Sequence, residues 1–227
     1  LEAGSSNAGQ MEGRSLSLEA GHNFRQGASG SLSVSELKME ENTILENLGR
    51  VEIKPASDGF SPSHDMKGQF INRGNALLAE TKQLNIGSEP TADHKVEAKF
   101  HTEAGAQTSF ADALVKTGSE LKNEGQESGK NLVVEKLAAY LIISRGESVW
   151  EDVRLEGNAT ISGGKLQVTT GFLRVENGAT LLNDGGTIHA HLIDESHVIG
   201  TIINKGEARF NQLTLSEGSE SVSYTHL

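Results

Sequence analysis

A short pattern of alternating apolar residues followed by glycine recurs along this chain. It occurs in Leu166–Gly171 and Leu173–Gly178, and again in Leu16–Gly21 and Leu213–Gly218. Alternation with a period of two indicates a strand with one buried face. A glycine after the strand indicates a corner where the backbone can reach positive φ without a Cβ clash. The repeating unit is therefore one strand and one turn.

A second pattern places asparagine two residues before glycine. It occurs in Leu45–Gly49, Phe70–Gly74, Leu121–Gly125, Leu181–Gly185 and Ile202–Gly206. Seven of the 14 asparagines have this spacing, several times the number expected by chance from 26 glycines in 227 residues. The asparagines of these five copies are 25, 51, 60 and 21 residues apart, roughly one, two, three and one copies of a 20–25-residue period. Such a period is typical of a solenoid.

The residue types decide which solenoid is expected. A leucine-rich repeat needs a helical segment in each repeat, and Leu166–Gly218 leaves no room for one between its glycines. We therefore predict an all-β fold, a right-handed parallel β-helix, with asparagines stacked at one corner and positive φ at Gly185 and Gly206. An antiparallel sandwich with ordinary hairpin turns is the alternative, but hairpins would not impose this spacing.

The domain organisation follows from where the repeat is interrupted. We expect one β-helix domain over residues 1–220, with polar loops at 54–67 and 88–95 that hold all three prolines, and a non-repeat tail at 221–227. Since the chain begins at Leu1 without a signal-peptide pattern, we expect a fragment of a longer rod. No apolar stretch is long enough to cross a membrane.

Two segments remain ambiguous between helix and strand. In Thr108–Gly118, Ser109 and Asp112 resemble a helix cap, and Phe110 and Leu114 have helical spacing, although an irregular coil fits equally well. Leu132–Ser144 contains a helix-like alanine pair and then residues that prefer a strand.

Few residues form a pattern that indicates a catalytic or metal-binding site. His189 and His191 flank one residue in a predicted strand, with Asp194 and His197 nearby, so they could contribute metal ligands; solvated outer positions are the more ordinary interpretation. Adjacent acidic residues such as Glu151 and Asp152 point to opposite faces of a strand and form no acid–base pair. Phosphate-loop, nucleophile-elbow and calcium-loop motifs are absent from the sequence. We predict no catalytic, cofactor-binding or metal site, and no cofactor.

The amino-acid composition limits the classes of partner and the compartment that we expect for this chain. The net charge of −11 would repel phosphate backbones, so we expect no nucleic acid partner. The chain has no cysteine, which suits a rod that must cross a periplasm without forming disulfides.

Leu173–Ile188 and Ile202–Phe210 resemble the coils of bacterial autotransporter passenger domains and filamentous-haemagglutinin-like adhesins. The resemblance covers most of Leu121–Gly218 and, more loosely, Leu16–Gly87. It implies a secreted rod on a bacterial cell surface that mediates attachment or aggregation, with the outer-membrane part elsewhere in the precursor. Its motifs are specific for architecture and not for a ligand.

Three function classes follow. The first is a non-catalytic, monomeric surface adhesin that binds protein or glycan ligands on host cells, matrix or sister cells, with the polar loops as contact sites. The second is a carbohydrate-active β-helix such as a polysaccharide lyase or a tailspike-type hydrolase, although Trp150, Tyr140 and Tyr224 are the only Trp and Tyr residues. The third is a passive spacer that presents another domain.

Overall fold

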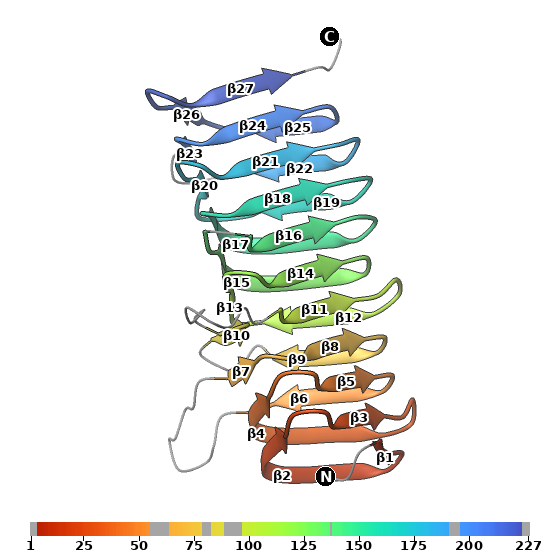
Figure 1. Cartoon of the computed structure of the whole chain (residues 1–227). Helices are drawn as coiled ribbons and strands as arrows, with labels where there is room; N and C mark the ends of the chain where they lie inside the picture. The colour runs from red at the N-terminus through yellow and green to blue at the C-terminus, as the bar shows by residue number, and fades with distance from the viewer. Residues whose placement is uncertain are drawn as a thin grey trace.

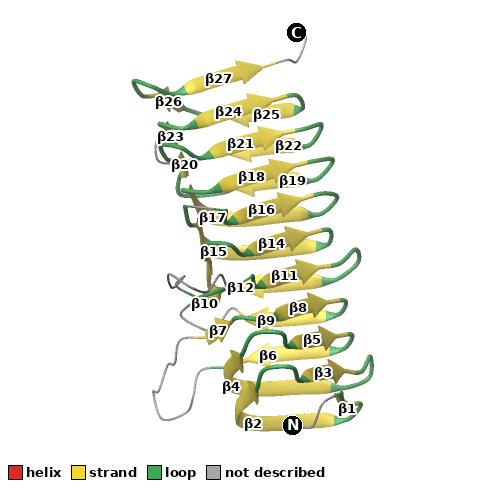
Figure 2. Ribbon diagram, viewed as in Figure 1, coloured by secondary structure: helices red, strands yellow, loops and turns green. Residues whose placement is uncertain are grey.

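The chain winds into a parallel β-solenoid of about nine turns, as a computed structural model shows (Figure 1). The structure describes residues 4–54, 64–78, 83–88, 97–136, 138–190 and 196–223. These residues form strands, turns and loops but no helix (Figure 2), which confirms the all-β parallel β-helix. Accordingly, the described residues include no helix with the length and apolarity needed to cross a membrane.

One face of the rod, face A, is a sheet of 11 strands in chain order. The strands are β1 (Ser5–Asn7), β3 (Asn23–Gln26), β5 (Ile44–Asn47), β8 (Gln69–Asn72), β11 (Lys99–Thr102), β14 (Glu120–Asn123), β16 (Tyr140–Ile143), β18 (Asn158–Ile161), β21 (Thr180–Asn183), β24 (Thr201–Asn204) and β27 (Glu220–Ser223). Each strand pairs in parallel with its equivalent in the next coil, so residues at one position form a column along the rod.

The second sheet has 16 strands and bends into two faces, B1 and B2. Four long strands run through the bend: β2 (Gln10–Leu18), β4 (Ser31–Met39), β15 (Gln126–Val134) and β17 (Glu147–Leu155). Face B1 adds β6 (Arg50–Ile53), β9 (Asn75–Leu78), β12 (Gln107–Phe110), β19 (Lys165–Val168), β22 (Thr187–Ala190) and β25 (Glu207–Phe210). Face B2 adds β7 (His64–Met66), β10 (Leu84–Ile86), β13 (Asp112–Val115), β20 (Leu173–Val175), β23 (Ser196–Val198) and β26 (Leu213–Leu215).

The core is a narrow column of side chains enclosed by the three faces. Most short strands alternate partly exposed and buried residues, as the period-two pattern predicts. Aromatic rings pack on one another along part of the axis. Phe70 stacks on Phe100 with centroids 4.7 Å apart, and Phe110 stacks on Trp150 at 5.5 Å. Phe100 and Phe110 meet edge to face at 5.2 Å. Each coil therefore buries its apolar side chains against the coils above and below it.

The corner between faces A and B1, here called the asparagine corner, contains the Asn-x-Gly pattern. The last residues of the face A strands form one column, which contains the buried Asn47, Asn72, Asn123 and Asn183. Asn47 Nδ2 donates to Asn72 Oδ1 (2.9 Å), and Asn183 Nδ2 donates to Asn204 Oδ1 (2.7 Å). The expected stacking of asparagines at one corner is confirmed.

Glycine is required at this corner for a reason that differs from the predicted one. Gly185 has a positive φ of 80°, as predicted. Gly206 does not have a positive φ, so the prediction for Gly206 is wrong. A Cβ on Gly206 would lie 2.3 Å from the carbonyl oxygen of Gly186 in the preceding coil. Gly49, Gly74 and Gly125 face carbonyl oxygens at 2.2–2.5 Å in the same way. These glycines allow two coils to approach closely, and the φ angle is not the constraint.

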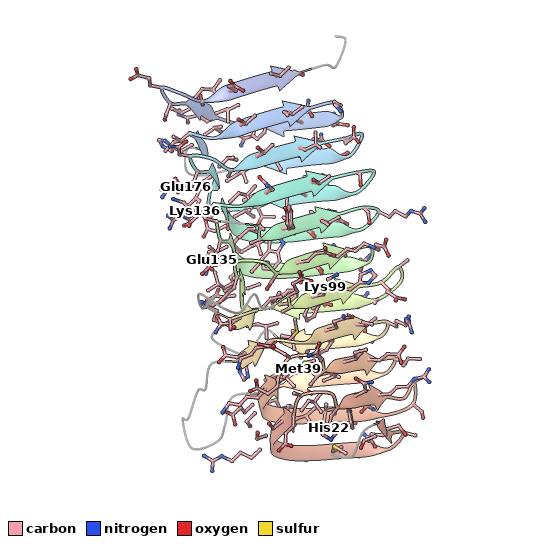
Figure 3. All side chains as sticks on the ribbon, in the orientation of Figure 1. His22, Met39, Lys99, Glu135, Lys136 and Glu176 are labelled. Atoms are coloured by element: carbon pink, nitrogen blue, oxygen red, sulfur yellow. The ribbon has the colours of Figure 1, made fainter. Side chains whose placement is uncertain are left out.

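Positive φ is concentrated instead at the corner between faces B2 and A, here called the left-handed corner. Gly21, Gly118 and Gly178 have φ values of 81°, 78° and 84° there. Ala138 occupies the left-handed region at the same corner with φ of 64°, which is unfavourable for a residue with a Cβ. Glu135, Lys136 and Glu176 lie along this edge of the rod (Figure 3), where Lys116 pairs with Glu135 at 3.7 Å.

The two ambiguous segments both form strands. Thr108–Gly118 contains the end of β12 and all of β13, so the helix considered for it is not formed. Leu132–Ser144 contains the end of β15 and all of β16. Most of the loops at 54–67 and 88–95 lies outside the described residues, as do residues 224–227, whereas β27 extends to Ser223.

Candidate functional site

A polar groove runs along the rod above the asparagine corner, on the side of face B1. Its main hollow has a volume of about 510 Å³. The lining residues are Gly105, Gln107, Glu124, Gly125, Gln126, Arg145, Gly146, Glu147, Gly163, Gly164, Lys165 and Thr187. Because they belong to strands and corners from β11 to β22, the groove follows the axis over several coils.

The floor of the groove is backbone. A Cβ on Gly125 would lie 2.5 Å from the carbonyl oxygens of Ala106 and Glu103, and a Cβ on Gly146 would lie 2.4 Å from that of Gly125. The backbone there is already hydrogen-bonded, since Glu147 N donates to Gly125 O and Lys165 N donates to Gly146 O, both at 2.9 Å or less. A ligand in the groove would therefore meet side chains and not free peptide groups.

The wall on face B1 consists of the first residue of each strand after the corner. Gln107 Nε2 lies 3.2 Å from Gln126 Oε1, and Lys165 Nζ lies 2.8 Å from Glu147 Oε1. Gln107, Gln126 and Glu147 also line a second hollow of about 250 Å³ on the same face, together with Ser109 and Ser128. Two carboxamides, an ion pair and a hydroxyl therefore follow one another along one continuous strip.

The opposite wall carries Glu124 and Arg145. The Lys122 ammonium, 3.0 Å from Glu124, together with His101 and Ser144, lowers the pKa of Glu124 to about 2 despite partial burial. Glu124 is thus a charged acceptor at neutral pH, and Glu147 is paired with Lys165. The Glu124 carboxylate therefore suits recognition of hydroxyl or amino groups better than proton transfer, which needs a pKa near the working pH.

Of the histidines considered as metal ligands, the two that the structure describes lie on different faces of the rod. His189 lies on β22, where its Nε2 is 3.3 Å from Glu207 Oε1, and this contact lowers the pKa of Glu207. His197 lies on β23 of face B2, in register with Arg174. His191 and Asp194 fall outside the described residues. The part of the chain that the structure describes contains no group of three or more potential metal ligands.

Sequence reasoning missed the groove residues, although a signal for them exists. Gln126, Glu147, Lys165 and Thr187 each follow a corner glycine directly. The residue after that glycine begins the face B1 strand and points outward, so the pattern would have placed them in one outer column. Their proximity to the opposite wall, however, depends on the shape of the corner.

Comparison with protein-family models, with curated proteins and with solved structures finds no match for this chain.

Proposed function

We propose that this chain is a non-catalytic, secreted rod on a bacterial cell surface that attaches to ligands on other surfaces through its side. The observation that carries the proposal is the groove above the asparagine corner, a strip in which successive coils present a polar side chain at the same position, with donors, acceptors and both signs of charge. A repeated polar strip suits a long or repetitive ligand, such as a glycan chain or an extended protein segment, because each coil adds a similar contact. The resemblance to autotransporter and filamentous-haemagglutinin-like coils supports the surface location.

The groove is tested with a triple variant, Gln126→Ala, Glu147→Ala and Lys165→Ala. The matched control is Asn131→Ala, Arg154→Ala and Glu176→Ala, which lies on face B2 and its edge, outside the groove column, and likewise removes one carboxamide and one ion pair (Arg154 Nε to Glu176 Oε1, 3.1 Å). Protein-coated beads are then scored for attachment to host cells, to matrix and to bacteria. We expect the groove variant to lose most of the attachment and the control to keep it.

The polar loops at 54–67 and 88–95 remain a second predicted contact region. Replacing residues 56–62 and 90–95 by short Gly/Ser linkers separates the two regions: loss of attachment only in the loop variant would move the binding site from the groove to the loops. Absence of attachment together with cleavage of acidic polysaccharides by the intact chain would replace the adhesin with a carbohydrate-active enzyme. Absence of both would leave the passive spacer.

A further inference from the structure

The interior of the rod is polar in three successive coils. On face B1 the second residue of each strand points inward, and it is aliphatic at Leu32, Val51, Leu166 and Ile188. In the middle of the rod the same column contains Thr108, Glu127 and Ser148, in register with one another and all buried. A carboxyl group therefore replaces an aliphatic side chain in the core.

Glu127 lies where two chains of hydrogen bonds meet. Thr102 Oγ1 donates to Glu127 Oε1 at 2.7 Å, and Ser148 Oγ donates to Glu127 Oε2 at 3.4 Å. Because the Thr102 hydroxyl donates its proton to Glu127, the Thr108 hydroxyl, 2.9 Å away, must be the donor to the Thr102 oxygen. Thr108 in turn accepts from Asn72 Nδ2 (2.8 Å). Thus a buried path of polar groups runs from the asparagine corner to this carboxyl.

The second chain reaches Glu127 from the opposite side. Asn123 Nδ2 donates to Ser148 Oγ at 2.7 Å, and the Ser148 proton is directed at Glu127 Oε2. The contact between Ser148 Oγ and Glu127 Oε2 is long for a hydroxyl hydrogen bond, so Oε2 is the more weakly hydrogen-bonded carboxylate oxygen. Oε2 is therefore the oxygen that takes up a proton most readily. A proton there would donate to the Ser148 oxygen, and the Ser148 hydroxyl would turn away.

No cation compensates this carboxyl among the described residues. The side chains that contact Glu127 are hydroxyls from β11 and β17, and neither titrates near neutral pH. The charged residues of the surrounding strands occupy outward positions: Lys99 and His101 on β11, Asp112 on β13, Glu120 and Lys122 on β14, Lys130 on β15, and Glu147, Glu151, Asp152 and Arg154 on β17. Burial raises the pKa of Glu127 to about 8, against the opposing effect of the two hydroxyls.

We propose that Glu127 is a proton-operated lock in the middle of the rod. With its proton in place, the coils from β11 to β17 close around a neutral side chain; without it, they enclose a buried charge that has only two hydroxyl donors. Glu127 lies between Gln126 and Ser128, which line the groove hollows on the outer surface. Loosening of these coils at higher pH would therefore disturb the strands that carry the groove wall.

The direction of the pH effect follows from linkage. A carboxyl whose folded-state pKa lies above its ordinary value of 4.5 contributes its full stability below that value. This contribution is lost progressively as the pH rises from 4.5 towards about 8, and above about 8 the stability no longer changes through this group. Each pH unit in the window changes the unfolding equilibrium constant up to tenfold, so the whole effect is at most on the order of a thousandfold.

The test compares the intact chain with Glu127→Gln and with a matched control on the outer face, Glu120→Gln, in urea titrations between pH 4.5 and 9. Trp150 is the only tryptophan and is buried two residues beyond Ser148, so its fluorescence reports on these coils. We expect the unfolding constant of the intact chain and of the control to rise with pH more than that of Glu127→Gln. The same pH dependence in all three proteins would overturn the proposal.

A spectroscopic measurement does not depend on how well the variant folds. In infrared difference spectra of the intact chain, we expect a protonated carboxyl band at pH 6 that disappears by pH 9. Thr102→Val removes the closer donor to the ionised form (2.7 Å) and should move the loss of this band to higher pH. Absence of a protonated carboxyl in the intact folded protein at pH 6 would refute the lock.

Discussion

Gly129 and Trp150 are packed so closely that a single methyl group between them should destabilise the rod. Gly129 on β15 is in register with Trp150 on β17, and the indole fills the space that a side chain at 129 would occupy. A Cβ built on Gly129 would lie 2.2 Å from Trp150 Cζ3 and 2.6 Å from Cε3. Ordinary contacts between carbons are about 3.5–4 Å, so the ring would have to move by more than 1 Å.

The ring has little freedom to move. Trp150 is fully buried and stacks on Phe110 with centroids 5.5 Å apart and an interplanar angle of 25°. Overpacking of a rigid core typically costs about 1–3 kcal/mol, and the short distances here place Gly129→Ala at the upper end, about 3 kcal/mol. Trp150→Leu should cost a similar amount because it leaves a cavity.

A double-mutant cycle tests this account. When Trp150 is replaced by leucine, the space beside residue 129 opens, so Gly129→Ala should cost less than about 1 kcal/mol in that background. The free energy of unfolding of the four proteins is measured by circular dichroism in urea, since two of them lack the tryptophan. Equal costs of Gly129→Ala in both backgrounds would show that the methyl group does not clash with the indole, and the packing argument would fail.

Three further predictions concern the corners and are measured by the same urea titrations. Gly125→Ala should lower the free energy of unfolding by about 3 kcal/mol or more, because its Cβ would meet backbone oxygens at 2.5 Å. Gly105→Ala should lower it by about 1 kcal/mol, because Gly105 has a φ of 85° but open space around it. The reverse order would contradict the close-approach argument. Ala138→Gly should stabilise the chain by roughly 0.5–1 kcal/mol, since it relieves a left-handed alanine, and a loss of stability would show that the alanine is unstrained. Asn123→Ala should cost about 2–3 kcal/mol, because three hydrogen bonds of 2.7–3.0 Å are lost, and Asn204→Ala less, because two of its three bonds are 3.4–3.5 Å. Equal costs of these two asparagine substitutions would mean that the ladder bonds contribute little.

The architecture could be predicted from the sequence because its signal is local and repeated. Each strand has a period-two pattern, and Asn183 and Asn204 come at the same point of successive coils, so stacking follows from spacing alone. Gly206 shows the limit of this reasoning. Its conformation is ordinary, and the atom that forbids a side chain belongs to Gly186 in the coil below. Such contacts are set by the pitch of the coil and are not visible in a local pattern.

The helix considered for Thr108–Gly118 shows a second limit. Phe110 and Leu114 have helical spacing, but in the rod Phe110 points inward and Leu114 points outward. The buried residues of β13 are Ala113 and Val115, which were not part of the helical pattern. Stacking on β10 and β15 supplies backbone partners for this strand, so pairing with the neighbouring coils overrides a weak cap signal.

Glu127 was not predictable as a core residue from its own segment, yet the asparagine column explains why polar groups enter the core there. The column changes residue type after Asn72, where Thr102 takes the next position, and after Asn123, where Ile143 and then Ile161 follow. An asparagine Nδ2 that loses its column acceptor must find another buried acceptor or be left unsatisfied, at a cost of about 1–3 kcal/mol.

Thr108 and Ser148 supply those acceptors from face B1. Asn72 Nδ2 donates to Thr108, and Asn123 Nδ2 donates to Ser148. Each hydroxyl brings a proton of its own that also needs an acceptor inside the core. Glu127 lies between them in the column, and its ionised carboxylate accepts directly from Ser148 and from Thr102, whose oxygen in turn accepts from Thr108. The ionised carboxylate is therefore the common acceptor that closes the polar ladder on both sides of its interruption, and an aliphatic residue at position 127 would leave the Thr102 and Ser148 hydroxyls without it.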